Sequence, residues 1–147
     1  RDQNLEGFVL IILICISTDI GGYIFGNLFK GPKLSKISPN KTKSGMIGSY
    51  ALSLVVSSIF VIQYSNDIYI EQNLIENDLK FIILILLISS VSQIGDLIIS
   101  YFKRSSKIKN TGNIIPGHGG LLDRIDGMIF VFPFVYLITL FSILINL

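Results

Sequence analysis

Residues 128–147, "MIFVFPFVYLITLFSILINL", form a run of twenty residues without a charged side chain. A helix needs about 20 predominantly apolar residues to cross the hydrocarbon core of a bilayer. Just before this run, residues 116–127, "PGHGGLLDRIDG", hold the only histidine of the chain together with Asp123, Arg124 and Asp126. The two stretches together predict a membrane span with chemically reactive residues at its start.

The composition of the whole chain agrees with a membrane protein. Half of the 147 residues are apolar and 15% are charged, against about 25% charged in typical soluble domains. Segments such as "FIILILLI" lack the polar face that a helix of a soluble bundle would need. We therefore predict an all-α fold, a polytopic transmembrane helix bundle forming a single domain. Its four expected spans cover residues 7–29, 46–64, 79–102 and 127–147.

The charges of the connections predict which side of the membrane each one faces. Residues 30–45 carry five lysines and no acid, and residues 103–126 carry five lysines or arginines. Residues 65–80 instead carry four acids and one lysine. Because short loops rich in Lys and Arg remain in the cytoplasm, we place the first and third connections there. The second connection and both termini are expected outside.

Other features of the composition exclude several classes of function. The net charge of +2 is too small to indicate a nucleic-acid partner. Cys15 is the only cysteine, so an internal disulfide is excluded, and a zinc site has no suitable ligands. The chain begins with Arg1, and no signal-peptide pattern precedes the first apolar run. We therefore expect it to be the C-terminal part of a longer protein.

Two carboxylates lie inside expected spans, where an ionisable residue is a functional candidate by default. Asp96 falls on a polar stripe of the third span, and Asp19 lies near a glycine pair in the first span. The alternative for both is a structural carboxylate that neighbouring helices satisfy. Small residues also recur every four positions in the second span, where close helix packing is the preferred explanation. These residues are Gly45, Ser49, Ser53 and Ser57.

The predicted topology places several acids at one depth. Asp19 and Asp96 both fall in the cytoplasmic halves of their spans, and Asp123 and Asp126 begin the last span at the cytoplasmic edge. Crowded carboxylates repel one another, and a divalent cation relieves that repulsion. Mg²⁺ suits such oxygen ligands, and it is usually held by one or two carboxylates plus substrate phosphates.

The cytoplasmic connections supply groups of opposite charge. "SPNKTKSG" in the first and "KRSSKIK" in the third bring lysine, arginine and hydroxyl donors to the same side. The glycines of "PGHGG" would let backbone N–H groups approach a phosphate. The alternatives are lysines that only set topology or attract anionic lipid, and an ordinary flexible loop. Taken together, the pattern favours a phosphate-bearing ligand, with a lipid as a fitting substrate.

At this point the residues resemble a known family. Residues 100–126, "SYFKRSSKIKNTGNIIPGHGGLLDRID", are similar to the signature of the phosphatidate cytidylyltransferase (CDP-diacylglycerol synthase) family. The preceding Gly95-Asp96, the run "TDIGGYIFGNLFK" and the run "ISPNKT" also resemble it. The matching signature residues are Ser100, Lys103, Arg104, Lys109, Pro116, His118, Gly119, Gly120, Asp123, Arg124 and Asp126.

The resemblance implies a magnesium-dependent enzyme that joins CTP to phosphatidate, giving CDP-diacylglycerol and pyrophosphate. On this basis Asp96 and Asp123 are expected to hold the metal, with Asp126 near and a second cation compatible with the site. His118 and Arg124 complete the expected catalytic set. The expected substrate-binding residues are Asp19, Ser38, Asn40, Lys41, Thr42, Lys103, Arg104, Lys109, Gly119 and Gly120. The expected location is the cytoplasmic membrane of a bacterium, with the site facing the cytoplasm.

Two other functions stay open at this stage. An ion-coupled transporter or channel would use Asp19 and Asp96 as an acidic relay. A catalytically weak paralogue would only bind nucleotide or lipid, since Ile99, Asn110 and the pair Lys43-Ser44 depart from the family pattern. For a homodimer, the helix faces rich in glycine and serine are the candidate contacts.

Overall fold

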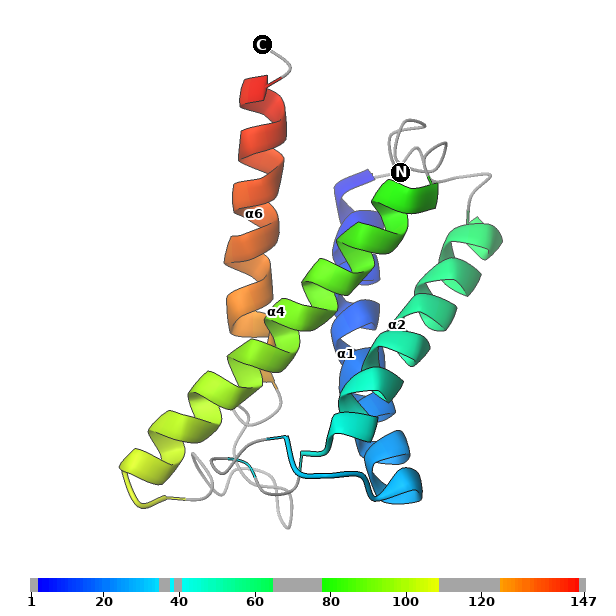
Figure 1. Ribbon diagram of the computed structural model, residues 1–147. Coiled ribbons are helices and arrows are strands. Elements are labelled where there is room, and N and C mark those ends of the chain that lie inside the picture. The colour runs from blue at the N-terminus through cyan, green and yellow to red at the C-terminus, as the bar shows by residue number, and fades with distance from the viewer. Residues whose placement is uncertain (1–2, 35–37, 39–40, 65–77, 109–124, 146–147) are drawn as a thin grey trace. The chain divides into compact units, whose positions relative to one another are not determined.

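A computed structural model describes residues 3–34, 38, 41–64, 78–108 and 125–145 of the chain (Figure 1). Its helices are α1 (Gln3–Phe29), α2 (Lys43–Tyr64), α4 (Asp78–Ser105) and α6 (Met128–Ile145). The β-pairing in the described part of the chain is one isolated bridge between Lys33 and Thr42. The prediction of an all-α transmembrane bundle is therefore confirmed.

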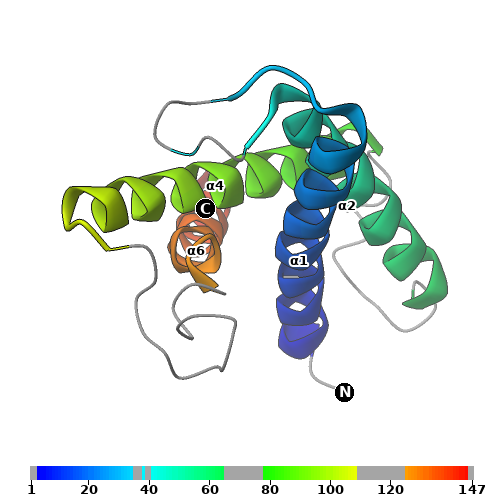
Figure 2. The ribbon, with the colours of Figure 1, turned by 90° about the horizontal axis from the view of Figure 1, so that it is seen from below.

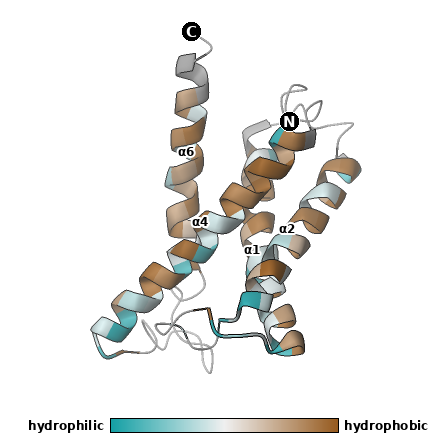
Figure 3. Cartoon of the chain, viewed as in Figure 1, coloured by the Kyte–Doolittle hydropathy of each residue, from teal (hydrophilic) through white to brown (hydrophobic). Residues whose placement is uncertain are grey.

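Three helices are long and apolar enough to cross a membrane, namely Leu5–Phe29, Lys43–Gln63 and Leu79–Ser105. The fourth apolar helix, α6, has 18 residues, or about 27 Å at 1.5 Å per residue, just short of a hydrocarbon core of roughly 30 Å. Figure 3 shows the helices mostly in the hydrophobic colour, with hydrophilic segments at the C-terminal end of α4. The chain is thus a multi-pass membrane protein, with three long spans and one shorter apolar helix in the described residues.

The chain forms two compact units, Arg1–Ser90 and Val91–Leu147. The first unit contains α1, α2 and the first half of α4. The second contains the remainder of α4 together with α6. Because α4 is one continuous helix, a single polar stripe along it serves both units.

Within the first unit, α1 and α2 lie side by side (Figures 1 and 2). A Cβ atom placed on Gly21 would lie 2.6 Å from the carbonyl oxygen of Gly48, and one on Gly45 would lie 2.7 Å from the carbonyl oxygen of Gly22. Such short distances mean that the two backbones touch where side chains are missing. Close packing through small residues is a common way to associate helices in lipid, and this prediction for the second span is confirmed.

Buried hydroxyl groups add specific bonds to this packing. The Ser49 hydroxyl donates to the carbonyl oxygen of Thr18 at 2.6 Å, and the Thr18 hydroxyl donates to Ser89 Oγ at 2.9 Å. Tyr50 and Ser90 share a further hydroxyl hydrogen bond of 2.9 Å. Interhelical hydrogen bonds in membranes contribute about 0.6 kcal/mol each on average. These bonds therefore set the register of the helices more than they stabilise the fold.

The close contact of α1 with α2 generates a stability prediction. Gly21→Ala places a methyl group against the Gly48 carbonyl oxygen, and overpacking of this kind costs about 1–3 kcal/mol. We expect a lower thermal unfolding midpoint in detergent. Gly7→Ala is the matched control on the same helix, because nothing lies within 4 Å of its Cβ position; it should leave stability unchanged or raise it by up to about 1 kcal/mol. Equal midpoints for the two variants would contradict the packing argument.

Candidate functional site

The candidate site lies in the second unit, where the start of α6 meets α4. A Cβ atom on Gly95 would lie 2.8 Å from the ring of Phe130 and 3.2 Å from the carbonyl oxygen of Gly127. A Cβ atom on Gly127 would lie 2.7 Å from Ser92 Oγ and 3.0 Å from Asp96 Oδ1. Glycine on both sides therefore lets the start of α6 approach the face of α4 that carries Ser92 and Asp96.

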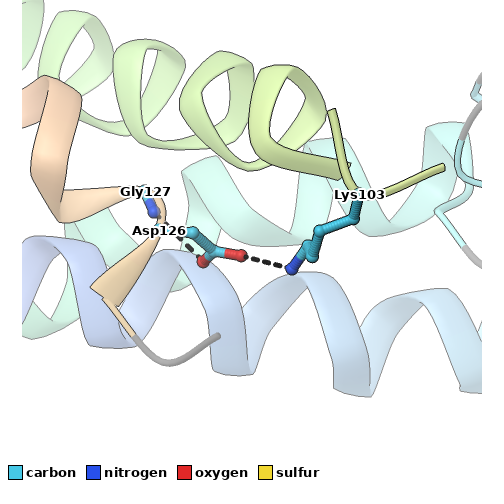
Figure 4. Close-up of polar contacts among 3 residues, drawn as sticks. All are labelled: Lys103, Asp126 and Gly127. Carbon is cyan, nitrogen blue, oxygen red and sulfur yellow. Dashed lines mark hydrogen bonds and ion pairs between the residues drawn. The ribbon is translucent and has the colours of Figure 1, made fainter. Parts of the chain in front are cut away.

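This approach brings Asp126 beside Asp96, and the two side chains share a hydrogen bond. Lys103 Nζ lies 3.2 Å from Asp126 Oδ2, with both side chains largely buried (Figure 4). The backbone N–H of Gly127 donates to Asp126 Oδ1 at 3.1 Å. One carboxylate is thus held by an ammonium group, a backbone N–H group and a second carboxyl group.

The surroundings of Asp126, which precedes the first residue of α6, change its acidity. Burial raises the pKa of Asp126, and the hydrogen bond and negative charge of Asp96 raise it further. The Lys103 ammonium acts in the opposite direction, and the resulting pKa is about 6 instead of 3.8. Two carboxyl groups in contact therefore favour a bound proton between them, and a divalent cation would satisfy the same pair.

The last turn of α4 places the basic residues of the signature. Lys107 adopts a left-handed conformation with φ 57°, while its N–H donates to Arg104 O and the N–H of Ile108 donates to Lys103 O, both at 3.0 Å. This is a Schellman end, which usually has glycine at the left-handed position. This end terminates the helix soon after Lys103 and Arg104. The Lys103 side chain contacts Asp126, whereas Arg104 is exposed.

The first connection supplies a helix cap where a ligand-binding residue was expected. Thr42 Oγ1 accepts a hydrogen bond from the Gly45 N–H at 3.1 Å, and the Thr42 carbonyl accepts one from Met46 N–H. Threonine is a favoured N-cap residue because it satisfies N–H groups at the start of a helix. Ser44 Oγ also accepts from the Gly31 N–H at 3.2 Å. In this structure Thr42 is therefore the N-cap residue of α2.

The other expected residues fall into two groups. Asp19 is an exposed residue of α1 in the first unit, whereas Asp96, Lys103 and Asp126 belong to the second. Ser38 and Lys41 lie in the first connection, where Lys41 N–H donates to Ser38 O at 3.1 Å. The remaining expected residues lie outside the described part of the chain: Asn40, Lys109, His118, Gly119, Gly120, Asp123 and Arg124.

Comparison with known proteins bears directly on this site. A sequence model of the cytidylyltransferase family matches residues 1–142. The chain belongs to the cytidylyltransferase family. It is 41% identical to a phosphatidate cytidylyltransferase of Bacillus subtilis over 97% of its own length and 52% of that protein. It is also 38% identical to one of Rickettsia typhi and 37% identical to one of Staphylococcus saprophyticus, over 95% of this chain and 61% and 51% of theirs.

The chain spans little more than half the length of these cytidylyltransferases, all three of which carry the enzyme's name rather than that of a transporter. The predicted family is confirmed. Among the described residues no three His, Cys, Asp or Glu side chains gather around one point. The geometry shows a pair, Asp96 with Asp126, whereas the predicted partner of Asp96, Asp123, lies outside the described part of the chain.

Sequence reasoning missed one feature of this candidate site. Ser92 was predicted only as part of the polar stripe on the third span. In the structure its Oγ is fully buried, faces the start of α6 and has no hydrogen-bond partner in the described part of the chain. Its position one helical turn before Asp96 is the signal that could have identified it.

The raised pKa of Asp126 predicts a pH dependence of stability. Because the folded state binds this proton more tightly than the unfolded state, the stabilisation is present at low pH and is lost as pH rises from about 4 to about 6. With divalent ions chelated, Asp126→Asn should therefore gain stability relative to the parent protein across that window. Thermal unfolding in detergent from pH 4 to pH 7 measures the difference, and parallel curves for the two proteins would contradict it.

Proposed function

We propose that this chain forms the nucleotide- and cation-binding part of a phosphatidate cytidylyltransferase. The reaction joins CTP to phosphatidate: a phosphate oxygen of the lipid forms a bond to the α-phosphorus of CTP. The bond from that phosphorus to the bridging oxygen of the β-phosphate breaks, and pyrophosphate leaves. The proposal is supported by the family match, by the names of the relatives and by the geometry around Asp126.

The contact of Asp96 with Asp126 is the single observation that carries the proposal. Both reacting partners are polyanions, so the barrier lies in bringing them together and in stabilising charge at the transferred phosphorus. A carboxylate pair has no favourable contact with phosphate unless a cation lies between them. The residues present therefore fit a hard divalent cation, because their donor atoms are oxygens and Mg²⁺ prefers these.

Each residue of the second unit has a role in this proposal. Asp96 and Asp126 would hold Mg²⁺, which when bound neutralises phosphate oxygens and orders them for in-line displacement. Lys103 pairs with Asp126 at 3.2 Å, so it offsets the negative charge of the pair before substrate arrives and lies next to the phosphates afterwards. Arg104, exposed at the end of α4, is available to bind the lipid phosphate or the triphosphate.

The proposal also assigns a location. The basic connections indicate a site that faces the cytoplasm of a bacterium, where CTP is dissolved, while the lipid substrate reaches it from the membrane. The residues Asp123, His118 and Arg124 would join the site from the third connection, and "SPNKT" from the first. A second cation and a homodimer are compatible with this arrangement.

The test is CTP-dependent conversion of phosphatidate in detergent micelles or liposomes. Asp96→Asn and Asp126→Asn should each lower kcat by roughly 100-fold or more, the scale expected when a group that stabilises transition-state charge is removed. The double replacement of Asp96 and Asp126 should abolish turnover.

Glu6→Gln is the control for these variants, because it makes the same acid-to-amide change in the first turn of α1 and should keep full activity. Turnover that survives the double replacement would sink the assignment of the cation site. Ion flux without any CTP turnover by the intact protein would sink the enzyme proposal itself.

A further inference from the structure

The hydroxyl of Ser92 is an exception among the buried hydroxyls of this structure. Seven serine and threonine side chains are buried in the described residues. Six of them take part in hydrogen bonds: Ser17, Thr18, Ser49, Ser53, Ser57 and Ser89. Ser92, at 1% exposure, makes none with the described residues. A buried hydroxyl without a partner costs free energy, so its position calls for an explanation.

A buried serine in a helix can satisfy its hydroxyl with a hydrogen bond to its own helix, and Ser92 does not make this bond. Serines in helices commonly donate to the carbonyl oxygen one turn earlier. Ser17, Ser57 and Ser90 do so here, at 2.6–2.7 Å. Ser92 has the same helical surroundings in α4, yet its hydroxyl faces the start of α6 instead. The Ser92 hydroxyl therefore lacks the bond to its own helix that the other three serines make.

The surroundings of Ser92 Oγ identify that partner. The Cβ position of Gly127 lies 2.7 Å from Ser92 Oγ and 3.0 Å from Asp96 Oδ1, so both oxygens border the same point. Ser92 and Asp96 are four residues apart on α4, the spacing at which helical side chains meet. The Asp96 carboxylate is therefore the side-chain acceptor that borders the same point as the Ser92 hydroxyl.

We propose that Ser92 is a positioning residue for the candidate cation site, and that its hydroxyl donates to the Asp96 carboxylate when that carboxylate holds a divalent cation. The inference rests on the proposed function. Carboxylates that bind metal ions are themselves oriented by hydrogen bonds from neighbouring groups. Ser92, whose side chain is buried, then supplies that hydrogen bond to Asp96.

The test measures cation binding directly, with Mn²⁺ as the probe and without CTP or lipid. Free Mn²⁺ is followed by electron paramagnetic resonance during titration of the intact protein in detergent. Ser92→Ala should weaken Mn²⁺ binding by roughly 10-fold, the lower end of the range for groups that orient metal ligands. Ser92→Thr, which keeps the hydroxyl, should restore most of the affinity.

A second readout separates positioning from a merely structural role. Because Ser92→Ala removes a buried polar group without a partner, its unfolding midpoint in EDTA should equal or exceed that of the parent protein. A structural hydroxyl would instead lower stability and affinity together. Ser57→Ala is the matched control, since the Ser57 hydroxyl donates to the Ser53 carbonyl oxygen of its own helix; it should leave Mn²⁺ affinity unchanged.

Two outcomes would overturn the inference. The first is Mn²⁺ binding by Ser92→Ala as tight as in the parent protein. The second is a parent protein that binds no Mn²⁺ at all. In the second case the turnover assay separates the two proposals: CDP-diacylglycerol formation would leave the enzyme proposal standing and remove only the cation site.

Discussion

The approach of α6 to α4 without intervening side chains is the contact on which the candidate site depends. Gly95 and Gly127 leave no methyl group between the helices, and so Asp126 reaches Asp96 from a helix start thirty residues further along the chain. Two carboxyl groups repel when both are ionised. The backbone N–H of Gly127 and the ammonium of Lys103 hold one of them in place, and a proton or a cation offsets the remaining repulsion.

Much of the fold follows from the sequence, because lipid imposes simple rules. Long apolar runs must be helical to satisfy their backbone groups, and the expected spans agree with α1, α2 and α4 to within a few residues. Small residues at helical spacing predicted the face on which α2 packs, and the contacts of Gly45 and Ser49 with α1 confirm it. These predictions need only periodicity and composition, which a single sequence contains.

The site was harder to predict, because it depends on where helices begin and end. Asp126 was expected to begin the last span, whereas α6 begins at Met128 and Asp126 lies in the turn before it. Asp126 therefore contacts Asp96 from a turn. The second span was expected to start at residue 46, but α2 starts at Lys43, and Thr42 caps it directly before that residue. Periodicity does not locate helix ends, and the hydrogen bonds of the caps do.

The polar stripe of α4 shows how one helix can serve structure and chemistry together. Ser89 accepts a hydrogen bond from Thr18 of α1, and further along the same face Ser92 and Asp96 meet the start of α6. Serine hydroxyls in membrane helices commonly hydrogen-bond to a neighbouring helix or to their own backbone. Where the partner is another helix, as at Ser89, the serine contributes to packing. Ser92 makes no such bond with the described residues, and in our proposal its hydroxyl donates to the Asp96 carboxylate one turn away when a cation is bound.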